Sequence, residues 1–238
     1  MQIEPETATR LGGWLFRHRT ALPLPVAAAI LLLRTGQAPP SPGLLAAGIS
    51  VTMAGELLRL WAVHYIGVIS RTRSDRLGPL VASGPFAIVR NPLYVGNIAL
   101  WVGFALTARL IWLAPVILVM LGAEYHAIVR WEERLLESRL GEAYRVYAAR
   151  VPRWWPTFSR EPRPSTLREP QGRPEPGRRA TGSGRADADP LMVSTPNHER
   201  SADAAVKRYS WRDTLFSERG TLLAIAAGYL LLWIKLRT

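Results

Sequence analysis

Five apolar blocks separated by arginine-bearing segments constrain this chain more than any other feature. A helix needs about 20 apolar residues to cross a bilayer, and the second block is long enough to do so. The third and fourth blocks are joined by a short turn at Arg109, so they must form an antiparallel hairpin. The sequence predicts an all-α, polytopic membrane protein with four core transmembrane helices. The five blocks occupy residues 21–33, 43–69, 93–108, 110–129 and 221–235.

The positive charges flank these blocks. In a soluble protein, a net charge of +12 would suggest a nucleic-acid partner. Here the arginines lie beside apolar blocks, where they indicate which connections face the cytoplasm. We therefore expect no nucleic-acid partner, with the N-terminus, the second connection and the region after residue 130 in the cytoplasm. The arginines that set this orientation are Arg10, Arg17, Arg19, Arg71, Arg73, Arg76 and Arg90. The chain has no cysteine, which excludes disulfides and thiolate chemistry, and its first 20 residues lack a signal-peptide pattern.

The chain beyond the fourth block divides into three parts. The helical pattern continues past the membrane to Gly141, and an amphipathic helix over 142–150 follows, completing a cytoplasmic cap and a membrane domain at 1–156. Residues 157–205 are rich in Pro, Gly, Ser and Arg, so we expect a disordered linker. Within 206–238 we expect a membrane-inserted helix, which Lys235 could extend by snorkelling.

Two groups of ionisable residues stand out. Glu56, Arg59 and His64 lie inside the second block, where charges are costly unless they are paired or functional. Glu56 and Arg59 lie three residues apart and could neutralise each other within one helix. Past the fourth block, Glu132 and Glu133 point about 100° apart on a helix, so they face different neighbours.

The segment GPFAIVRNPLYVG (84–96) and the later RWEERLLESRLGEAYRVYAARVP (130–152) resemble the isoprenylcysteine carboxyl methyltransferase and phospholipid methyltransferase superfamily. The shared pattern is Gly-Pro-aromatic, Arg-His/Asn-Pro-x-Tyr-x-Gly, a helical hairpin, Arg-x-Glu-Glu-x-x-Leu, Gly-x-x-Tyr-x-x-Tyr and Val-Pro. The resemblance covers 61–156. It implies an integral-membrane enzyme that uses S-adenosylmethionine, faces the cytoplasm of a prokaryotic cell and takes a lipophilic acceptor from the bilayer.

The resemblance also implies the site residues. Arg130, Glu133 and Arg90 would be catalytic. The cofactor-binding residues would be Gly84, Pro85, Asn91, Pro92, Tyr94, Gly96, Glu132 and Glu133. Eukaryotic members carry His where this chain has Asn91, a bacterial-type variant, and Asn cannot titrate near neutral pH. The residues agree with this chemistry: the cofactor's ammonium needs a Glu, and its carboxylate needs an Arg or free backbone N–H groups.

Several functions compete with this hypothesis. No glycine-rich dinucleotide fingerprint and no metal-ligand spacing is present, so we expect neither a soluble Rossmann enzyme nor a metal site. A membrane reductase of the steroid 5α-reductase type could place a nicotinamide cofactor's phosphate on Arg71, Arg73 and Arg76. A non-enzymatic adaptor could work through the linker and tail. The acceptor also stays open between a carboxylate, which an Arg would orient, and a lipid amine, which needs a base.

Overall fold

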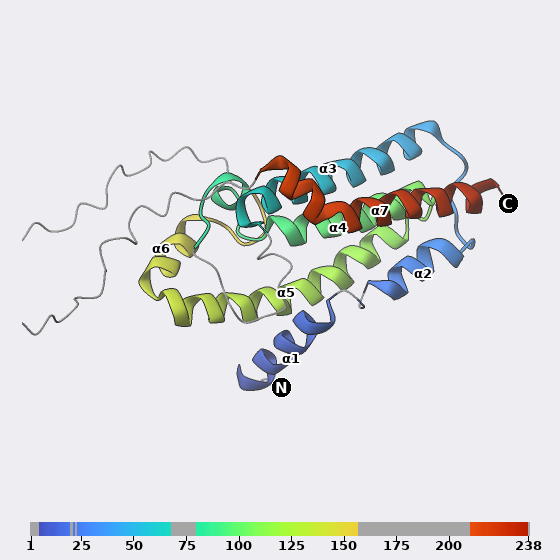
Figure 1. The fold of residues 1–238 in the computed structure, drawn as a ribbon. Coiled ribbons are helices and arrows are strands. Elements are labelled where there is room, and N and C mark those ends of the chain that lie inside the picture. The colour runs from blue at the N-terminus through green and yellow to red at the C-terminus, as the bar shows by residue number, and fades with distance from the viewer. Residues whose placement is uncertain (1–4, 20, 22, 68–79, 157–209, 238) are drawn as a thin grey trace, which may run out of the picture. The chain divides into compact units, whose positions relative to one another are not determined.

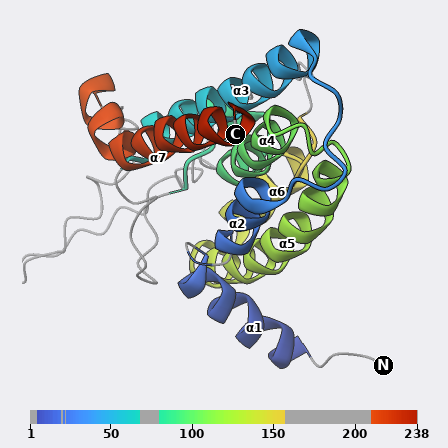
Figure 2. The same ribbon diagram turned by 90° about the vertical axis from the view of Figure 1, so that its right-hand side faces the viewer.

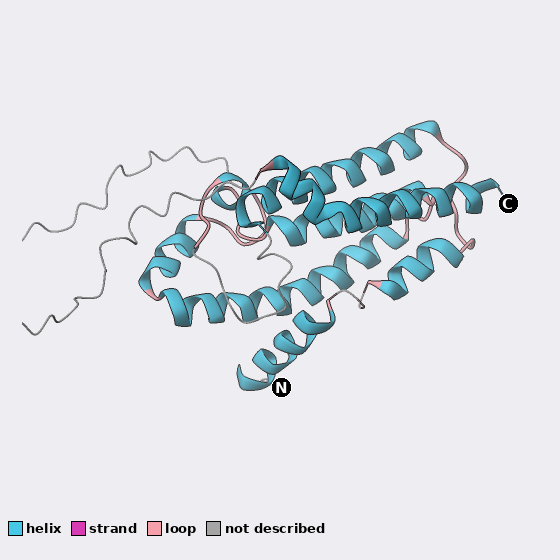
Figure 3. Cartoon of the chain, viewed as in Figure 1, coloured by secondary structure: helices cyan, strands magenta, loops and turns pink. Residues whose placement is uncertain are grey.

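The computed structural model describes residues 5–19, 21, 23–67, 80–156 and 210–237 (Figure 1). Helices and the loops that join them make up these residues, with no strand among them (Figure 3), which confirms the predicted all-α class. They belong to one compact unit, Met1–Thr157 with Val206–Thr238. The segment expected to be disordered, 157–205, lies outside the described residues. The elements are α1 (Pro5–His18), α2 (Leu24–Leu32), α3 (Pro42–Ile66), the 3-10 turn η2 (Gly84–Ala87), α4 (Pro92–Thr107), α5 (Leu113–Leu140), α6 (Glu142–Arg150) and α7 (Trp211–Arg237).

Three of these helices, α3, α5 and α7, are long and apolar enough to cross a membrane, and α4 is a shorter apolar helix. Their outward side chains include Leu57, Val119 and Leu223, which are 60 %, 71 % and 68 % exposed, as expected of residues that face lipid. The first predicted span differs from expectation. It is the nine-residue α2, only about 14 Å long at 1.5 Å per residue, and α1 precedes it, a helix that the sequence patterns did not predict.

Helices α3 and α4 pack closely because both carry glycine where they meet. A Cβ added to Gly55 would lie 2.7 Å from the carbonyl oxygen of Gly96, and one added to Gly96 would lie 2.7 Å from that of Gly55. Small residues let membrane helices approach until their backbones touch. Gly96 therefore serves the contact between α3 and α4.

The hairpin and the cap follow the prediction. Arg109 adopts φ 63° between α4 and α5, and α5 runs without a break past the membrane-spanning length to Leu140. Gly141, at φ 53°, ends α5 and starts α6. The buried core lies where α5 meets α1, α2 and α4, around Ile117, Leu121 and Ile128.

Helix α7 lies along α3 and α4 (Figure 2). Residues on the covered face of α7 recur every three or four positions, the 3.5-residue period by which one helix follows another. They include the buried Thr214, Glu218, Leu232 and Lys235 and the half-buried Thr221, Ile225 and Gly228. At its end, the Lys235 ammonium donates to the carbonyl oxygens of Ile30 and Leu33, both at 2.6 Å. These carbonyls close α2, whose C-terminal dipole favours a cation.

Candidate functional site

The turn η2 sets the direction of the chain ahead of α4. Gly84 has φ 61°, a conformation that favours glycine, and a Cβ there would strike the ring of Tyr65. Pro85 and Phe86 are buried, and the Pro85 carbonyl accepts from the amides of Ile88 and Val89 at 3.1 and 3.0 Å. This fixed turn carries the chain directly to Arg90.

Asn91 and Pro92 join the turn to α4. Pro92 occupies the first turn of the helix, where a missing N–H costs nothing. Asn91 makes no side-chain cap on α4, and its Nδ2 donates instead to the carbonyl oxygen of Arg153 at 3.1 Å. Asn91 therefore ties the start of α4 to the segment after α6, a role that needs no titration.

Glu132 and Glu133, which are adjacent on α5, reach different partners, as their angular separation predicts. Glu132 Oε1 accepts from the Tyr94 hydroxyl at 3.1 Å, and the Tyr94 ring lies 4.8 Å from that of Tyr125. Glu133 Oε1 lies 2.9 Å from Nη1 of Arg90. The arginine of the first motif and the glutamate of the second therefore form an ion pair, with side chains 14 % and 13 % exposed.

Arg153 is a second partner of Glu133 that sequence reasoning missed. Its Nε lies 3.0 and 3.1 Å from the two carboxylate oxygens, and Nη2 lies 2.5 Å from Oε2. These bonds raise the pKa of the Arg153 guanidinium. The segment is held in place because the Arg90 amide donates to the Pro152 carbonyl at 2.9 Å. In the sequence, only its position directly after the Val-Pro motif indicated that Arg153 could belong to the site.

Helix α6 covers this ion cluster with two tyrosines. The Tyr147 hydroxyl donates to the Phe86 carbonyl at 2.8 Å, so α6 is bonded to η2. Tyr144 is 4 % exposed and contacts Arg90. Burial, with Glu133 nearby, raises the pKa of Tyr144 to about 12. Burial also raises the pKa of Tyr147, so both remain neutral at physiological pH.

A third arginine approaches Glu132 from the N-terminal segment. The Arg19 guanidinium lies 4.0 Å from the centre of the Phe16 ring and is close enough to interact electrostatically with Glu132. The sequence patterns used Arg19 only to orient the chain. Its placement depends on α1, which packs against α5 through Gly12.

Other predicted site residues lie elsewhere or cannot be placed. Arg130 is exposed and is not part of the cluster of Arg90, Glu133 and Arg153. Gly96 lies against Arg59 and Gly55. Arg71, Arg73 and Arg76 lie outside the described residues. Within the described part of the chain, no three His, Cys, Asp or Glu residues are grouped so as to hold a metal ion.

The arrangement favours an anionic ligand. Two guanidinium groups, those of Arg90 and Arg153, share the single carboxylate of Glu133, which leaves one positive charge in excess in this cluster. The Nε of Arg90 is buried and has no acceptor among the described residues. Guanidinium N–H groups recognise carboxylates with good geometry, so a carboxylate would satisfy both the charge and this donor.

Comparison with known proteins agrees with the motifs. The family model for phospholipid methyltransferases matches residues 44–143. The nickel-cobalt-cadmium resistance protein NccN of Alcaligenes xylosoxydans xylosoxydans is 33 % identical over 156 residues, covering 63 % of this chain and 70 % of NccN. The cobalt-zinc-cadmium resistance protein CzcN of Cupriavidus metallidurans is 31 % identical over 119 residues, 50 % of this chain and 52 % of CzcN. No solved structure matches significantly.

The matched residues contain the helices α4 and α5, the motif from Gly84 to Gly96 and the pair Glu132 and Glu133. With helices long enough to cross a membrane and a relative that the match covers over more than two thirds of its length, the chain belongs to the phospholipid methyltransferase family of integral membrane proteins.

Proposed function

We propose that this chain transfers a methyl group from S-adenosylmethionine to a lipophilic acceptor at the cytoplasmic face of a bacterial membrane. The observation that carries the proposal is the meeting of both family motifs at Glu133, which pairs with Arg90 at 2.9 Å and with Arg153 at 2.5 Å. Such buried, multiply bonded charges in a family of methyltransferases are expected at a functional site.

The residues of the site fit the charged groups of this cofactor. Its carboxylate would accept from Arg90, whose Nε is a buried donor with no acceptor among the described residues. Its ammonium would pair with Glu132, which otherwise accepts from Tyr94 at 3.1 Å. When bound, the cofactor supplies an electrophilic methyl group on a sulfonium, and the protein contributes position and electrostatics. Glu133 would keep Arg90 and Arg153 fixed.

We infer that the acceptor is a carboxylate on a lipid-like molecule. A carboxylate is nucleophilic at neutral pH and needs only to be oriented, whereas a protonated amine must first lose a proton to a base. The one positive charge in excess at Arg90 and Arg153 matches a single carboxylate, that of the cofactor, so an acceptor carboxylate would be oriented by hydrogen bonds from the guanidinium groups and not by a second excess charge. Methyl label that resists base treatment would favour a lipid amine instead.

The other two functions are less well supported. A nicotinamide-dependent reductase would depend on Arg71, Arg73 and Arg76, which lie outside the described residues, and the family match favours methyl transfer. An adaptor that works through residues 157–238 would not require the ion pairs of Glu133.

Calorimetric titration of the purified chain separates the two cofactor classes. We expect S-adenosylhomocysteine to bind and NADP not to bind, because the site offers one carboxylate for an ammonium and one excess cation for a carboxylate. Binding of NADP alone would overturn the proposal in favour of the reductase.

The names of the two relatives add a physiological expectation, since both refer to cobalt and cadmium resistance. We propose that methylation by this chain supports tolerance of these ions. Expression in a metal-sensitive bacterium should raise the cobalt or cadmium concentration that stops growth, and Glu133→Gln should remove the gain. Equal tolerance with and without the chain would contradict this proposal.

A further inference from the structure

The side chain of Arg59 on α3 makes polar contacts with side chains from three helices, α3, α4 and α7. Its Nε lies 3.1 Å from Glu56 Oε2 one turn earlier, which confirms the pairing within α3 that the spacing allowed. Its Nη2 lies 2.7 Å from Oε2 of Glu218 on α7 and 3.4 Å from the Thr221 hydroxyl. Its Nη1 donates to Oδ1 of Asn97 on α4. Glu218 is only 2 % exposed.

Asn97 connects this arginine to the candidate site. Because its Oδ1 accepts from Arg59, its Nδ2 is left to donate, and Tyr125 is its side-chain partner. The Tyr125 ring lies 4.8 Å from that of Tyr94, whose hydroxyl donates to Glu132. An unbroken series of contacts therefore leads from Glu218 to a carboxylate of the candidate site.

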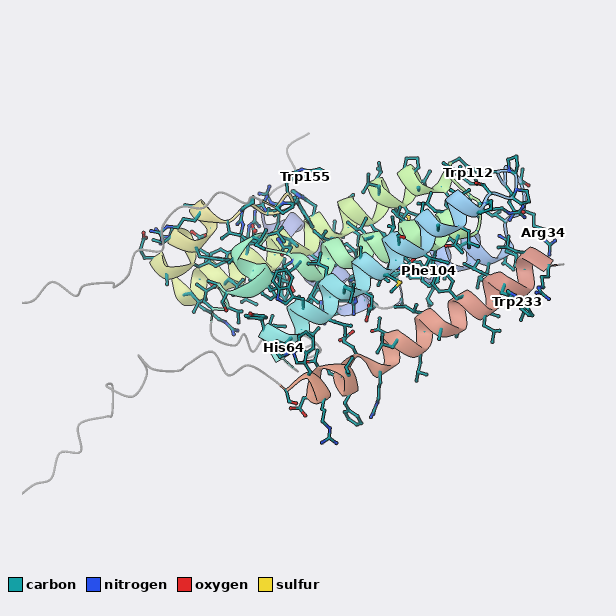
Figure 4. All side chains as sticks on the ribbon, turned by 90° about the horizontal axis from the view of Figure 1, so that it is seen from above. Arg34, His64, Phe104, Trp112, Trp155 and Trp233 are labelled. Carbon is teal, nitrogen blue, oxygen red and sulfur yellow. The ribbon has the colours of Figure 1, made fainter. Side chains whose placement is uncertain are left out.

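Other contacts hold α7 without touching Arg59. The Tyr229 hydroxyl donates to Thr52 on α3 at 2.8 Å. His64 Nδ1 lies 3.4 Å from the Thr214 hydroxyl, and its ring stacks on Trp211 at 4.1 Å. Figure 4 shows His64 beside the start of α7 and Arg34 beside its other end. Docking of α7 can therefore be varied separately from the contact between Glu218 and Arg59.

We propose that Glu218 is a positioning residue for the candidate site, acting through Arg59 and Asn97 on Tyr94 and Glu132. The proposal rests on the proposed function, because it assigns Glu132 to the cofactor. It extends that function to α7, which lies outside the family match at residues 44–143.

The physical reason lies in the shape of the guanidinium. It is planar with its donors in fixed directions, so acceptors on two sides define its orientation. Glu218 and Thr221 hold the Nη2 side, which aims Nη1 at Asn97. Without the carboxylate of Glu218, Arg59 can swing toward Glu56. Asn97 then loses a fixed partner, and Tyr125 and Tyr94 lose theirs in turn.

The test is calorimetric titration of the full-length chain with S-adenosylhomocysteine. Glu218→Gln should weaken binding about tenfold, the size of effect that residues coupled to a site through such contacts can have. Tyr229→Phe breaks another bond between α7 and α3, and Asp213→Asn removes an exposed carboxylate from α7; both should bind as the unchanged chain does. If Tyr229→Phe weakened binding as much as Glu218→Gln does, the proposal would be overturned. That result would indicate that binding requires only the docking of α7 against α3, and not the contact between Glu218 and Arg59.

A double-mutant cycle with Tyr94→Phe tests the route. If Glu218 acts through Tyr94, adding Glu218→Gln to the Tyr94→Phe variant should lower the affinity for S-adenosylhomocysteine by less than about threefold. The reason is that the effects of coupled residues are not additive. If instead Glu218→Gln lowered the affinity about tenfold in both backgrounds, the two residues would act independently and the proposal would be overturned. Since a general loss of stability would act additively, this readout separates positioning from support of the fold.

Arg59→Lys is an independent variant in case Glu218→Gln fails to fold. A single ammonium cannot replace a planar guanidinium that bonds to Asn97 and Glu218 at the same time. We therefore again expect about a tenfold loss of affinity for S-adenosylhomocysteine. Unchanged binding would overturn the proposal. If the unchanged chain binds and Glu218→Gln binds equally, this inference alone fails. If the unchanged chain does not bind, the proposed function fails and the inference with it.

Discussion

Two ionic clusters in the described part of the chain, one around Glu133 and one around Arg59, use the same residue types in opposite proportions. Around Glu133, two guanidinium groups share one carboxylate, and a buried donor of Arg90 has no acceptor among the described residues. Around Arg59, one guanidinium is shared by two carboxylates, an amide and a hydroxyl. The first cluster has capacity left for a ligand, while the second uses its donors to join α3, α4 and α7. The excess positive charge is therefore the difference that supports the proposed binding site at Glu133, in contrast to the junction at Arg59.

The largest effect should follow from removing the arginine of the junction. Arg59→Met keeps an unbranched side chain but takes the guanidinium away from Glu218, which is 2 % exposed. Breaking a buried pair typically costs about 3 to 5 kcal/mol, so unfolding by heat or denaturant should show a loss in this range. Adding Glu218→Gln should recover part of it. Unchanged stability of Arg59→Met would contradict the role of the junction.

Glu133→Gln should act mainly on binding. The substitution keeps the shape but leaves Arg90 and Arg153 without their shared carboxylate, so their orientation is lost and they repel each other. We expect affinity for S-adenosylhomocysteine to fall about 100-fold, since truncating one partner of a buried charge pair costs about 2 to 5 kcal/mol. Glu137→Gln, which removes an exposed carboxylate on α5, is the matched control. Equal binding by both variants would contradict the site assignment.

Arg153→Lys should have an intermediate effect. Lysine keeps the charge but loses the bonds that Nε and Nη2 make with both oxygens of Glu133. A loss of about 1.5 kcal/mol in binding, roughly tenfold, is expected, at the lower end of the range for bonds to a charged group because lysine keeps the charge. Arg150→Lys, on the last turn of α6, should bind normally. If both variants lost affinity alike, general charge on this surface would explain the result better than Arg153.

The smallest effect concerns alkaline pH. The pKa of Tyr144 is raised to about 12 in the folded chain, above the ordinary value of 10, so its contribution to stability is complete below pH 10 and is lost as the pH rises toward 12. Tyr144→Phe should therefore lose less stability than the unchanged chain between pH 10 and 12. The measurement is the free energy of unfolding of both proteins at several pH values between 10 and 12. If it fell equally with pH in the unchanged chain and in Tyr144→Phe, Tyr144 would not be buried as described.

The sequence predicted the elements that depend on local pattern. The hairpin at Arg109, the continuation of α5 to Gly141 and the helix over 142–150 depend on apolar runs and glycine stops, and each was confirmed. The pairing of Glu56 with Arg59 follows from helical spacing and was also confirmed. The separation of Glu132 and Glu133 onto different partners follows from 3.6 residues per turn.

Contacts between distant segments could not be predicted in the same way. Arg153 reaches Glu133 because its segment is attached by a backbone hydrogen bond from the Arg90 amide and by a side-chain hydrogen bond from Asn91 Nδ2. Glu218 lies 159 residues from Arg59, and the apolar pattern placed the tail block after it, at 221–235. The 3.5-residue spacing of Thr214, Glu218 and Thr221 was a readable signal, but it does not reveal which helix α7 packs against.

The most direct test of methyl transfer uses membranes that contain the chain, incubated with methyl-labelled S-adenosylmethionine and then treated with base. We expect label in the lipid-soluble fraction before base treatment and its release as methanol afterwards, as the proposed carboxylate acceptor requires, and no label above background with Glu133→Gln. No label transfer by the unchanged chain, or equal transfer by Glu133→Gln, would contradict the assignment of methyl transfer to the site at Glu133.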